Sequence, residues 1–230
     1  MKSWFAIDGR LPRIDFSGDS SYRYAEVLVE RMLKLYSRPN DWVLDPFCGF
    51  GTTLRVCSRM NRLAVGFEVE KAVYDYASRT VPIPSRLHHD SAANISSYAY
   101  PKFNLLLTSP PFRSFNSRDV LDGDCYYEEL LTIFKALLPA LSDGAYVIVE
   151  SVNLISSSQS IPRAFRSALA LGSILTFERE YVCCNRSNTD VVPGYQHSYL
   201  LVFRNAMSQL EAAGKTIPKS NAPTHSLGRA

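Results

Sequence analysis

Apolar residues recur at helical spacing near the start of the chain. Between residues 24 and 36 the apolar positions are Ala25, Leu28, Val29, Met32, Leu33, Leu35 and Tyr36. This spacing predicts an amphipathic helix that ends before Pro39. The short apolar run at residues 42–44 predicts a strand, and residues 52–60 predict a second helix. A tight loop containing two glycines separates that strand from the second helix.

The alternation of short apolar runs and amphipathic stretches continues along the chain. We predict strands at residues 63–67, 86–88, 103–107 and 145–149, and helices at residues 71–78, 126–141 and 162–171. Residues 103–107 are almost continuously apolar, which is typical of a central parallel strand covered on both faces. The pattern therefore predicts a doubly wound α/β sheet that is mostly parallel.

The last part of the pattern has a different character. Residues 173–183 and 197–203 are rich in β-forming residues and are joined by a polar loop, which predicts a terminal antiparallel hairpin at the sheet edge. Residues 206–230 are rich in Ala, Ser, Lys and Pro, and we expect a flexible tail there. Residues 1–205 are then one domain, because a chain of 230 residues can bury one substantial core.

Composition adds little to this picture. The net charge of +3 is compatible with a polyanionic partner but is too small to identify one. The N-terminus lacks a signal core and no apolar run approaches about 18 residues, so we expect a soluble, cytoplasmic protein with no membrane association. Five cysteines without a CxxC pair or a nearby His predict reduced thiols and no metal site.

The loop after the first strand of the sheet has the chemistry of a ligand site. Gly49 and Gly51 let the backbone approach a ligand closely. Leu54 occupies the position of a third glycine and no Lys follows, which disfavours a dinucleotide fingerprint and a phosphate loop. Glu68, at the end of the second strand, lies where an acid accepts hydrogen bonds from ribose hydroxyls, and Asp90 is a candidate acceptor for an adenine amino group. The set predicts an adenosine site, with a ligand-free turn, a solvated Glu and a capping Asp as the alternatives.

A second candidate site follows the strand predicted at residues 103–107. Thr108-Ser109-Pro110-Pro111-Phe112 lies at the carboxyl edge, where open α/β sheets bind ligands. The two prolines remove two donors and leave carbonyl groups as acceptors. Phe112 offers a flat face for a base taken out of its helix. The alternative is that Pro-Pro only ends the strand and Phe112 fills the core.

The two motifs together resemble those of a known family. Asp45-Pro46-Phe47-Cys48-Gly49-Phe50-Gly51-Thr52-Thr53 resembles the cofactor motif of the amino-group DNA methyltransferases, and Thr108-Ser109-Pro110-Pro111-Phe112 resembles their catalytic motif. Weaker matches, which include Val65-Gly66-Phe67-Glu68, extend the resemblance over residues 24–205. The chain departs from the family pattern in two ways. Phe50 replaces a small Ser and is expected to crowd the methionine end of the cofactor, and no large insertion for target recognition is present.

The resemblance implies a Rossmann-like methyltransferase fold that binds S-adenosyl-L-methionine. The cofactor-binding residues it implies are Asp45, Pro46, Phe47, Cys48, Gly49, Gly51, Thr52, Thr53, Glu68 and Asp90. The catalytic residues it implies are Ser109, Pro110, Pro111 and Phe112, with Ser109 and the Pro110 carbonyl accepting from the target amino group and Phe112 stacking on the base.

The Ser-Pro-Pro-aromatic form is associated in this family with the N4 amino group of cytosine in DNA. We therefore expect a site-specific DNA methyltransferase of the kind found in restriction–modification systems. An N6-adenine enzyme, an RNA amino-group methyltransferase and an inactive binding subunit are the alternatives, and a homodimer is left open.

Three further expectations concern side chains around these motifs. No Cys follows a Pro, which disfavours the thiolate mechanism of C5-cytosine enzymes. Arg113, Asn116 and Arg118 are candidate contacts to nucleic acid, with a solvated polar loop as the alternative. His197 is a candidate substrate neighbour, with a structural histidine as the alternative.

Overall fold

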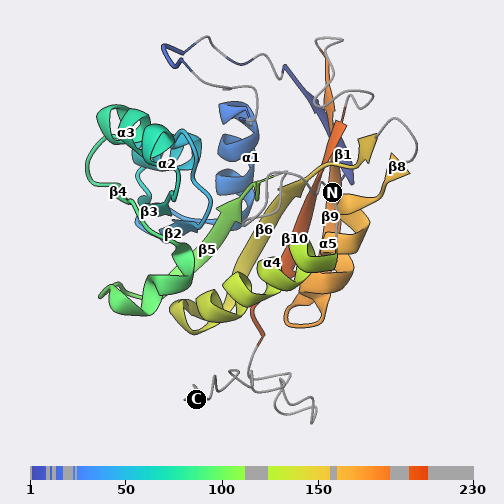
Figure 1. Cartoon of the computed structure of the whole chain (residues 1–230). Coiled ribbons are helices and arrows are strands. Elements are labelled where there is room, and N and C mark those ends of the chain that lie inside the picture. The colour runs from blue at the N-terminus through green and yellow to red at the C-terminus, as the bar shows by residue number, and fades with distance from the viewer. Residues whose placement is uncertain are drawn as a thin grey trace, which may run out of the picture.

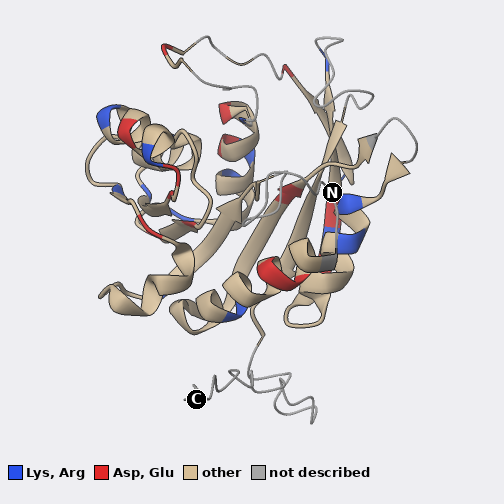
Figure 2. Ribbon diagram, viewed as in Figure 1, with Lys and Arg blue, Asp and Glu red and all other residues tan. Residues whose placement is uncertain are grey.

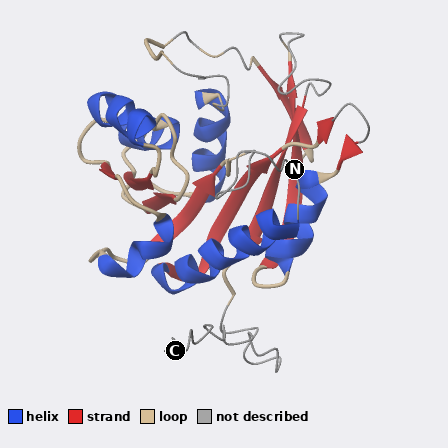
Figure 3. Ribbon diagram, viewed as in Figure 1, coloured by secondary structure: helices blue, strands red, loops and turns tan. Residues whose placement is uncertain are grey.

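The computed structural model describes residues 2–8, 11, 14–17, 23, 25–111, 124–155, 160–186 and 197–206. They form an eight-stranded sheet with helices on both faces (Figures 1 and 3). Its order is β1-β9-β10-β6-β5-β2-β3-β4. The strands are β1 Trp4–Ile7, β2 Trp42–Asp45, β3 Leu63–Phe67, β4 Arg86–His88, β5 Phe103–Thr108, β6 Leu141–Ser151, β9 Thr176–Asn185 and β10 His197–Arg204. A small separate hairpin joins β7 (Leu154–Ile155) to β8 (Ser160–Ile161).

Strand β2 is the centre of the sheet topology. It pairs in parallel with β3 on one side and β5 on the other, with Leu44 opposite both Val65 and Leu106. The chain proceeds from β2 outward through β3 to β4, and then returns to form β5 on the other side of β2. The carboxyl ends of β2 and β5 therefore meet at a topological switch point, where open α/β sheets bind ligands.

Each face of the sheet carries its own hydrophobic core. The helices are α1 Glu26–Tyr36, α2 Thr52–Arg59, α3 Lys71–Thr80, α4 Asp124–Leu137 and α5 Arg163–Gly172, with 3₁₀ turns η1 Ala92–Ser97 and η2 Leu138–Ala140. One core packs α1 and α2 against Val43, Leu105 and Ile148. The other packs α4 and α5 against strand residues such as Leu106 and Val147. Neighbouring residues on a strand point to opposite faces, which is why the central strands are apolar throughout.

The structure confirms the doubly wound sheet and corrects two details. β9 and β10 form the predicted antiparallel pair, but β1 pairs in parallel outside β9, with Phe5 opposite Cys183, so the hairpin is not the edge. The helix predicted to reach residue 141 ends at Leu137, because Pro139 interrupts it, and β6 begins at Leu141. Residues 207–230 of the predicted tail lie outside the described residues.

Two general features of the helices are their charged residues and their length. Both acidic and basic residues occur on α1 and on α3 (Figure 2). In the part of the chain that the structure describes, no helix combines the length and apolar character needed to cross a membrane.

Gly66 on β3 gives a direct test of how tightly the glycine loop packs on the sheet. A Cβ at this position would lie 2.9 Å from Cys48 Cβ and 2.9 Å from Leu54 Cδ1. We expect Gly66→Ala to lower the free energy of unfolding by about 1–3 kcal/mol, because the core must shift to accept the methyl group. Urea denaturation measures this change.

The control is Gly172→Ala at the end of α5, where nothing lies within 4 Å of an added Cβ. Its effect should stay within about 1 kcal/mol. Equal losses in the two variants would contradict the tight packing at Gly66.

Candidate cofactor and active site

The glycine loop after β2 turns sharply back over the sheet. Cys48 N donates to the Phe67 carbonyl at 3.0 Å, and Gly51 N donates to the Cys48 carbonyl at 2.8 Å. Gly49 and Gly51 both have positive φ, +49° and +80°. A Cβ at Gly51 would lie 2.5 Å from Val81 Cγ2, whereas at Gly49 no atom beyond the two chain neighbours lies within 4 Å. Gly51 is therefore required for packing, whereas the space beside Gly49 is open.

Glu68, the acid that follows β3, is hydrogen-bonded to the backbone of the glycine loop. Its Oε2 accepts from Gly49 N at 3.0 Å, and its Oε1 accepts from Glu70 N at 2.7 Å. Burial raises the pKa of the Glu68 carboxyl, against the opposing effect of these backbone donors. The carboxylate and the loop thus form one unit.

Asp90 takes part in a local network after β4. It accepts from Asn94 Nδ2 at 2.8 Å and from the Tyr98 hydroxyl at 2.9 Å. These hydrogen bonds hold the pKa of the Asp90 carboxyl below its usual range. The helix cap at this point is Ser91, whose side chain accepts from Ala93 N, so Asp90 is not itself the cap. Contact of Asp90 with an adenine ring stays a prediction.

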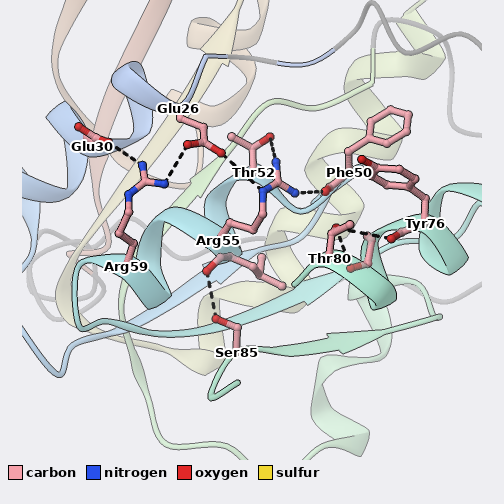
Figure 4. Close-up of polar contacts among 11 residues, drawn as sticks. Glu26, Glu30, Phe50, Thr52, Arg55, Arg59, Tyr76, Thr80 and Ser85 are labelled. Carbon is pink, nitrogen blue, oxygen red and sulfur yellow. Dashed lines mark hydrogen bonds and ion pairs between the residues drawn. The ribbon is translucent and has the colours of Figure 1, made fainter. Parts of the chain in front are cut away.

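Arg55 fixes the loop from the other side (Figure 4). Its Nη1 donates to the Phe50 carbonyl at 2.6 Å, and its Nη2 donates to Thr52 Oγ1 at 3.4 Å. Its Nε lies 3.5 Å from Glu26 on α1. The sequence pattern did not indicate this role, although Arg55 follows Thr52 by about one turn of the helix that begins at the loop. Arg59 adds an exposed ion pair to Glu26 at 2.9 Å.

A buried hydrogen bond joins the glycine loop to the Ser-Pro-Pro loop. Thr108 Oγ1 donates to Asp45 Oδ1 at 2.7 Å, and both residues are fully buried. The same Asp45 oxygen accepts from Phe47 N at 3.3 Å. Strands β3 and β4 lie between the two motifs in the sequence. In the structure the motifs nevertheless meet at the switch point between β2 and β5.

The remaining predicted loop residues are mostly buried. Pro46, Cys48, Thr52 and Thr53 are buried, and Phe47 is half-buried against the core below α4. Burial raises the pKa of the Cys48 thiol well above its ordinary value. A thiol held neutral in this way agrees with a packing role rather than a nucleophilic one.

Ser109 has a partner that the sequence analysis did not identify. Its Oγ donates to Glu150 Oε2 at 2.7 Å, and Glu150 is buried near the end of β6. Burial raises the pKa of Glu150, while hydrogen bonds from Ser109 and Ser198 act in the opposite direction. The available signal was a carboxylate following the apolar run at residues 145–149. Pro110 is buried and Pro111 exposed, whereas Phe112 lies outside the described residues.

Strand β10 begins at this same edge because it runs antiparallel to β6. Tyr199 lies opposite Ser151, and the His197 Nε2 atom lies 3.2 Å from the Tyr199 hydroxyl. His197 is therefore near the Ser109 edge with a structural partner, and substrate contact stays a prediction. The candidate contacts Arg113, Asn116 and Arg118 lie outside the described residues.

The bond between the two motifs can be tested by removing one hydroxyl. We expect Thr108→Val to lower the free energy of unfolding by about 1–3 kcal/mol, because Asp45 loses a buried donor while the side-chain shape is kept. Urea denaturation measures the loss. The matched control is Thr176→Val on an exposed position of β9, and a similar effect in both variants would argue against the bond.

Glu150 should make stability depend on pH. Because its folded-state pKa is raised, the folded protein binds this proton more tightly than the unfolded chain does. The stability from this group is therefore present below the ordinary value of about 4.3 and is lost as the pH rises through the folded pKa. We therefore expect the wild type to lose stability relative to Glu150→Gln as the pH rises. The quantity to follow is the free energy of unfolding of the wild type minus that of the variant, which should fall.

Urea unfolding at stepped pH gives this difference directly. Glu180→Gln, on an exposed position of β9, is the matched control for loss of a carboxylate. If the free energy of unfolding of the wild type rose relative to that of Glu150→Gln with increasing pH, the predicted direction would be wrong.

The segment around the glycine loop is similar in sequence to known proteins. Residues 21–79 match the family model described as DNA methylase, whose name covers N6 and N4 methyltransferases. Type II methyltransferase M.BglII of Bacillus subtilis is 46% identical over 55 residues. The aligned segment covers 24% of this chain and 15% of M.BglII, so the chain spans well under two thirds of that relative.

Solved structures extend the likeness to the fold. A methyltransferase from Pyrococcus furiosus has a TM-score of 0.55 and 14% identity, covering 78% of this chain and 82% of its own. The N-methyltransferase NodS from Bradyrhizobium japonicum, in complex with S-adenosyl-L-homocysteine, has a TM-score of 0.55 and 10% identity, covering 78% and 85%. At this identity the likeness establishes a Rossmann-like methyltransferase fold. The match over residues 21–79 makes this segment of the chain similar to the amino-group DNA methyltransferases.

Proposed function

We propose that this protein is an S-adenosylmethionine-dependent DNA methyltransferase that methylates an exocyclic amino group, with the N4 amino group of cytosine as the first choice. The observation that carries the proposal is the buried bond from Thr108 to Asp45. It brings a loop suited to an adenosine next to a loop suited to an amino group. DNA is the proposed partner, and residues 1–205 are the proposed catalytic domain.

The residues around the glycine loop fit the cofactor. Gly49 leaves an open face, and Glu68 lies beside it with a carboxylate suited to ribose hydroxyls. S-adenosylmethionine supplies a methyl group made electrophilic by its sulfonium. The NodS neighbour holds the demethylated product of this cofactor, which supports the same ligand here.

The hydrogen bond from Ser109 to Glu150 determines where the lone pairs of Ser109 Oγ point. Because the hydroxyl hydrogen points to Glu150, the oxygen is left to accept a hydrogen bond from the target amino group. In the proposal the Pro110 carbonyl accepts a second one. Two acceptors hold the amino nitrogen in line for transfer, and positioning of this kind can contribute several kcal/mol.

Ser109 and Glu150 also offer a route for the proton. A methylated amino nitrogen carries one proton too many, and Ser109 Oγ can pass it to the Glu150 carboxylate. The raised pKa makes Glu150 a stronger base than an ordinary exposed carboxylate. Both roles belong to the chain's own side chains.

The choice of base rests on the sequence motif. The Ser-Pro-Pro form favours N4 of cytosine, while the matching family covers N6 and N4 enzymes alike. N6 of adenine is therefore the nearest alternative, followed by an RNA amino group and an inactive binding subunit. The product of the reaction separates them.

We expect purified protein, unmethylated DNA and labelled S-adenosylmethionine to yield N4-methylcytosine, identified by mass spectrometry after digestion to nucleosides. Ser109→Ala should lower the rate by about 100-fold or more, because it removes both the acceptor and the link to Glu150. Phe112→Ala should also lower the rate. The matched control is Ser97→Ala, an exposed serine at the end of η1, which should leave the rate unchanged.

Each other outcome has a distinct meaning. N6-methyladenine would keep the site and overturn the choice of base. Cofactor binding without a methylated nucleoside would point to RNA or a missing partner. Failure to bind S-adenosylmethionine would leave only the inactive subunit.

A further inference from the structure

Three aromatic rings meet at the glycine loop, and we call them the aromatic clasp: Phe16, Phe50 and Tyr76. Their centroids lie 5.0 Å apart for Phe16 and Phe50, 5.5 Å for Phe50 and Tyr76, and 6.0 Å for Phe16 and Tyr76. All three pairs are edge-to-face, which is a favoured geometry for aromatic rings. The clasp joins the segment at residues 14–17, the glycine loop and α3.

The Phe50 ring has a fixed base on the loop. Arg55 holds the Phe50 carbonyl at 2.6 Å, and the next residue, Gly51, fits tightly against Val81. Phe50 is only 8% exposed, and its ring lies beside Tyr76 of α3 (Figure 4). Phe50 is therefore a rigid anchor rather than a mobile surface side chain.

The N-terminal part of the chain reaches the loop through this anchor. Phe16 places its ring on Phe50 and Tyr76, and the Arg23 guanidinium lies 5.9 Å from the Phe50 ring. Two separate points before α1 thus contact the middle residue of the glycine loop. A serine at position 50 would offer neither contact.

We propose that the aromatic clasp fastens residues 14–17 across the glycine loop and thereby slows release of the cofactor. This inference rests on the proposed function, because it concerns the same S-adenosylmethionine site. It assigns Phe50 and Phe16 a positioning role: they hold a covering segment and take no part in the chemistry. Phe50, the departure from the family motif, is then the residue that makes this cover possible.

Stopped-flow measurement of S-adenosylmethionine binding tests the clasp. Phe16→Ala and Phe50→Ser should each raise the dissociation rate by about tenfold, equivalent to about 1.4 kcal/mol. The association rate should be unchanged or raised, because an unfastened cover admits the cofactor more readily. A variant that merely distorts the loop would associate more slowly instead.

Controls separate the clasp from a general loss of packing. Phe50→Tyr keeps the ring and should retain the wild-type rates. Phe177→Ala removes an exposed ring that packs on Phe203 near the start of β9, and it should have no effect. Strands β10, β6 and β5 lie between β9 and β2 in the sheet. The double variant Phe16→Ala/Phe50→Ser should dissociate little faster than the single variants, because both remove the same contact.

The outcomes distinguish this inference from the proposed function. If the wild type binds S-adenosylmethionine and the two variants release it at the wild-type rate, the clasp is overturned alone. Effects that add in the double variant, or slower association in the single variants, overturn it as well. If the wild type does not bind the cofactor, the proposed function and the clasp fall together.

Discussion

The hydrogen bond between Thr108 and Asp45 is the constraint on which the rest of the site depends. A buried carboxylate is costly unless donors surround it, so Asp45 requires partners such as this hydroxyl. The partner can come from β5 only because the strand order reverses at β2, which makes the parallel strands β2 and β5 neighbours. Once this bond is made, Ser109 and the glycine loop lie on either side of it. The fold thus positions two functional loops through one polar contact.

Two further acids complete the site, each tied to one of these loops. Glu68 is held by the backbone of the glycine loop, and Glu150 is held by Ser109. Burial raises the pKa of both, so each retains a proton more readily than a solvated carboxylate. Their different partners favour different tasks. In the proposed function, Glu68 accepts from ribose hydroxyls, and Glu150 lies behind the Ser109 hydroxyl that would meet an amino group.

Local patterns predicted much of the fold, and contacts between distant segments account for what they missed. The strands at residues 63–67 and 86–88 have the predicted bounds, because turn residues delimit their apolar runs. β1 was missed because four residues carry little periodicity, and its partner β9 lies far away in the sequence. The two motifs predicted the loops, but not the partners of their side chains. Glu150 meets Ser109 only after β5 and β6 pair, which no local pattern records.

Contacts between distant segments also change the interpretation of Phe50. From the sequence alone, a large ring in place of a small Ser suggests a crowded cofactor site and favours an inactive subunit. In the structure the ring packs on Phe16 and Tyr76, and Arg55 holds its carbonyl from α2. The ring is therefore accommodated by contacts with α3 and the N-terminal segment, while Glu68 remains beside Gly49. A substitution that builds its own packing partners is better explained as a feature of a working site than as its loss. On this reasoning Phe50 supports the enzyme over the inactive subunit.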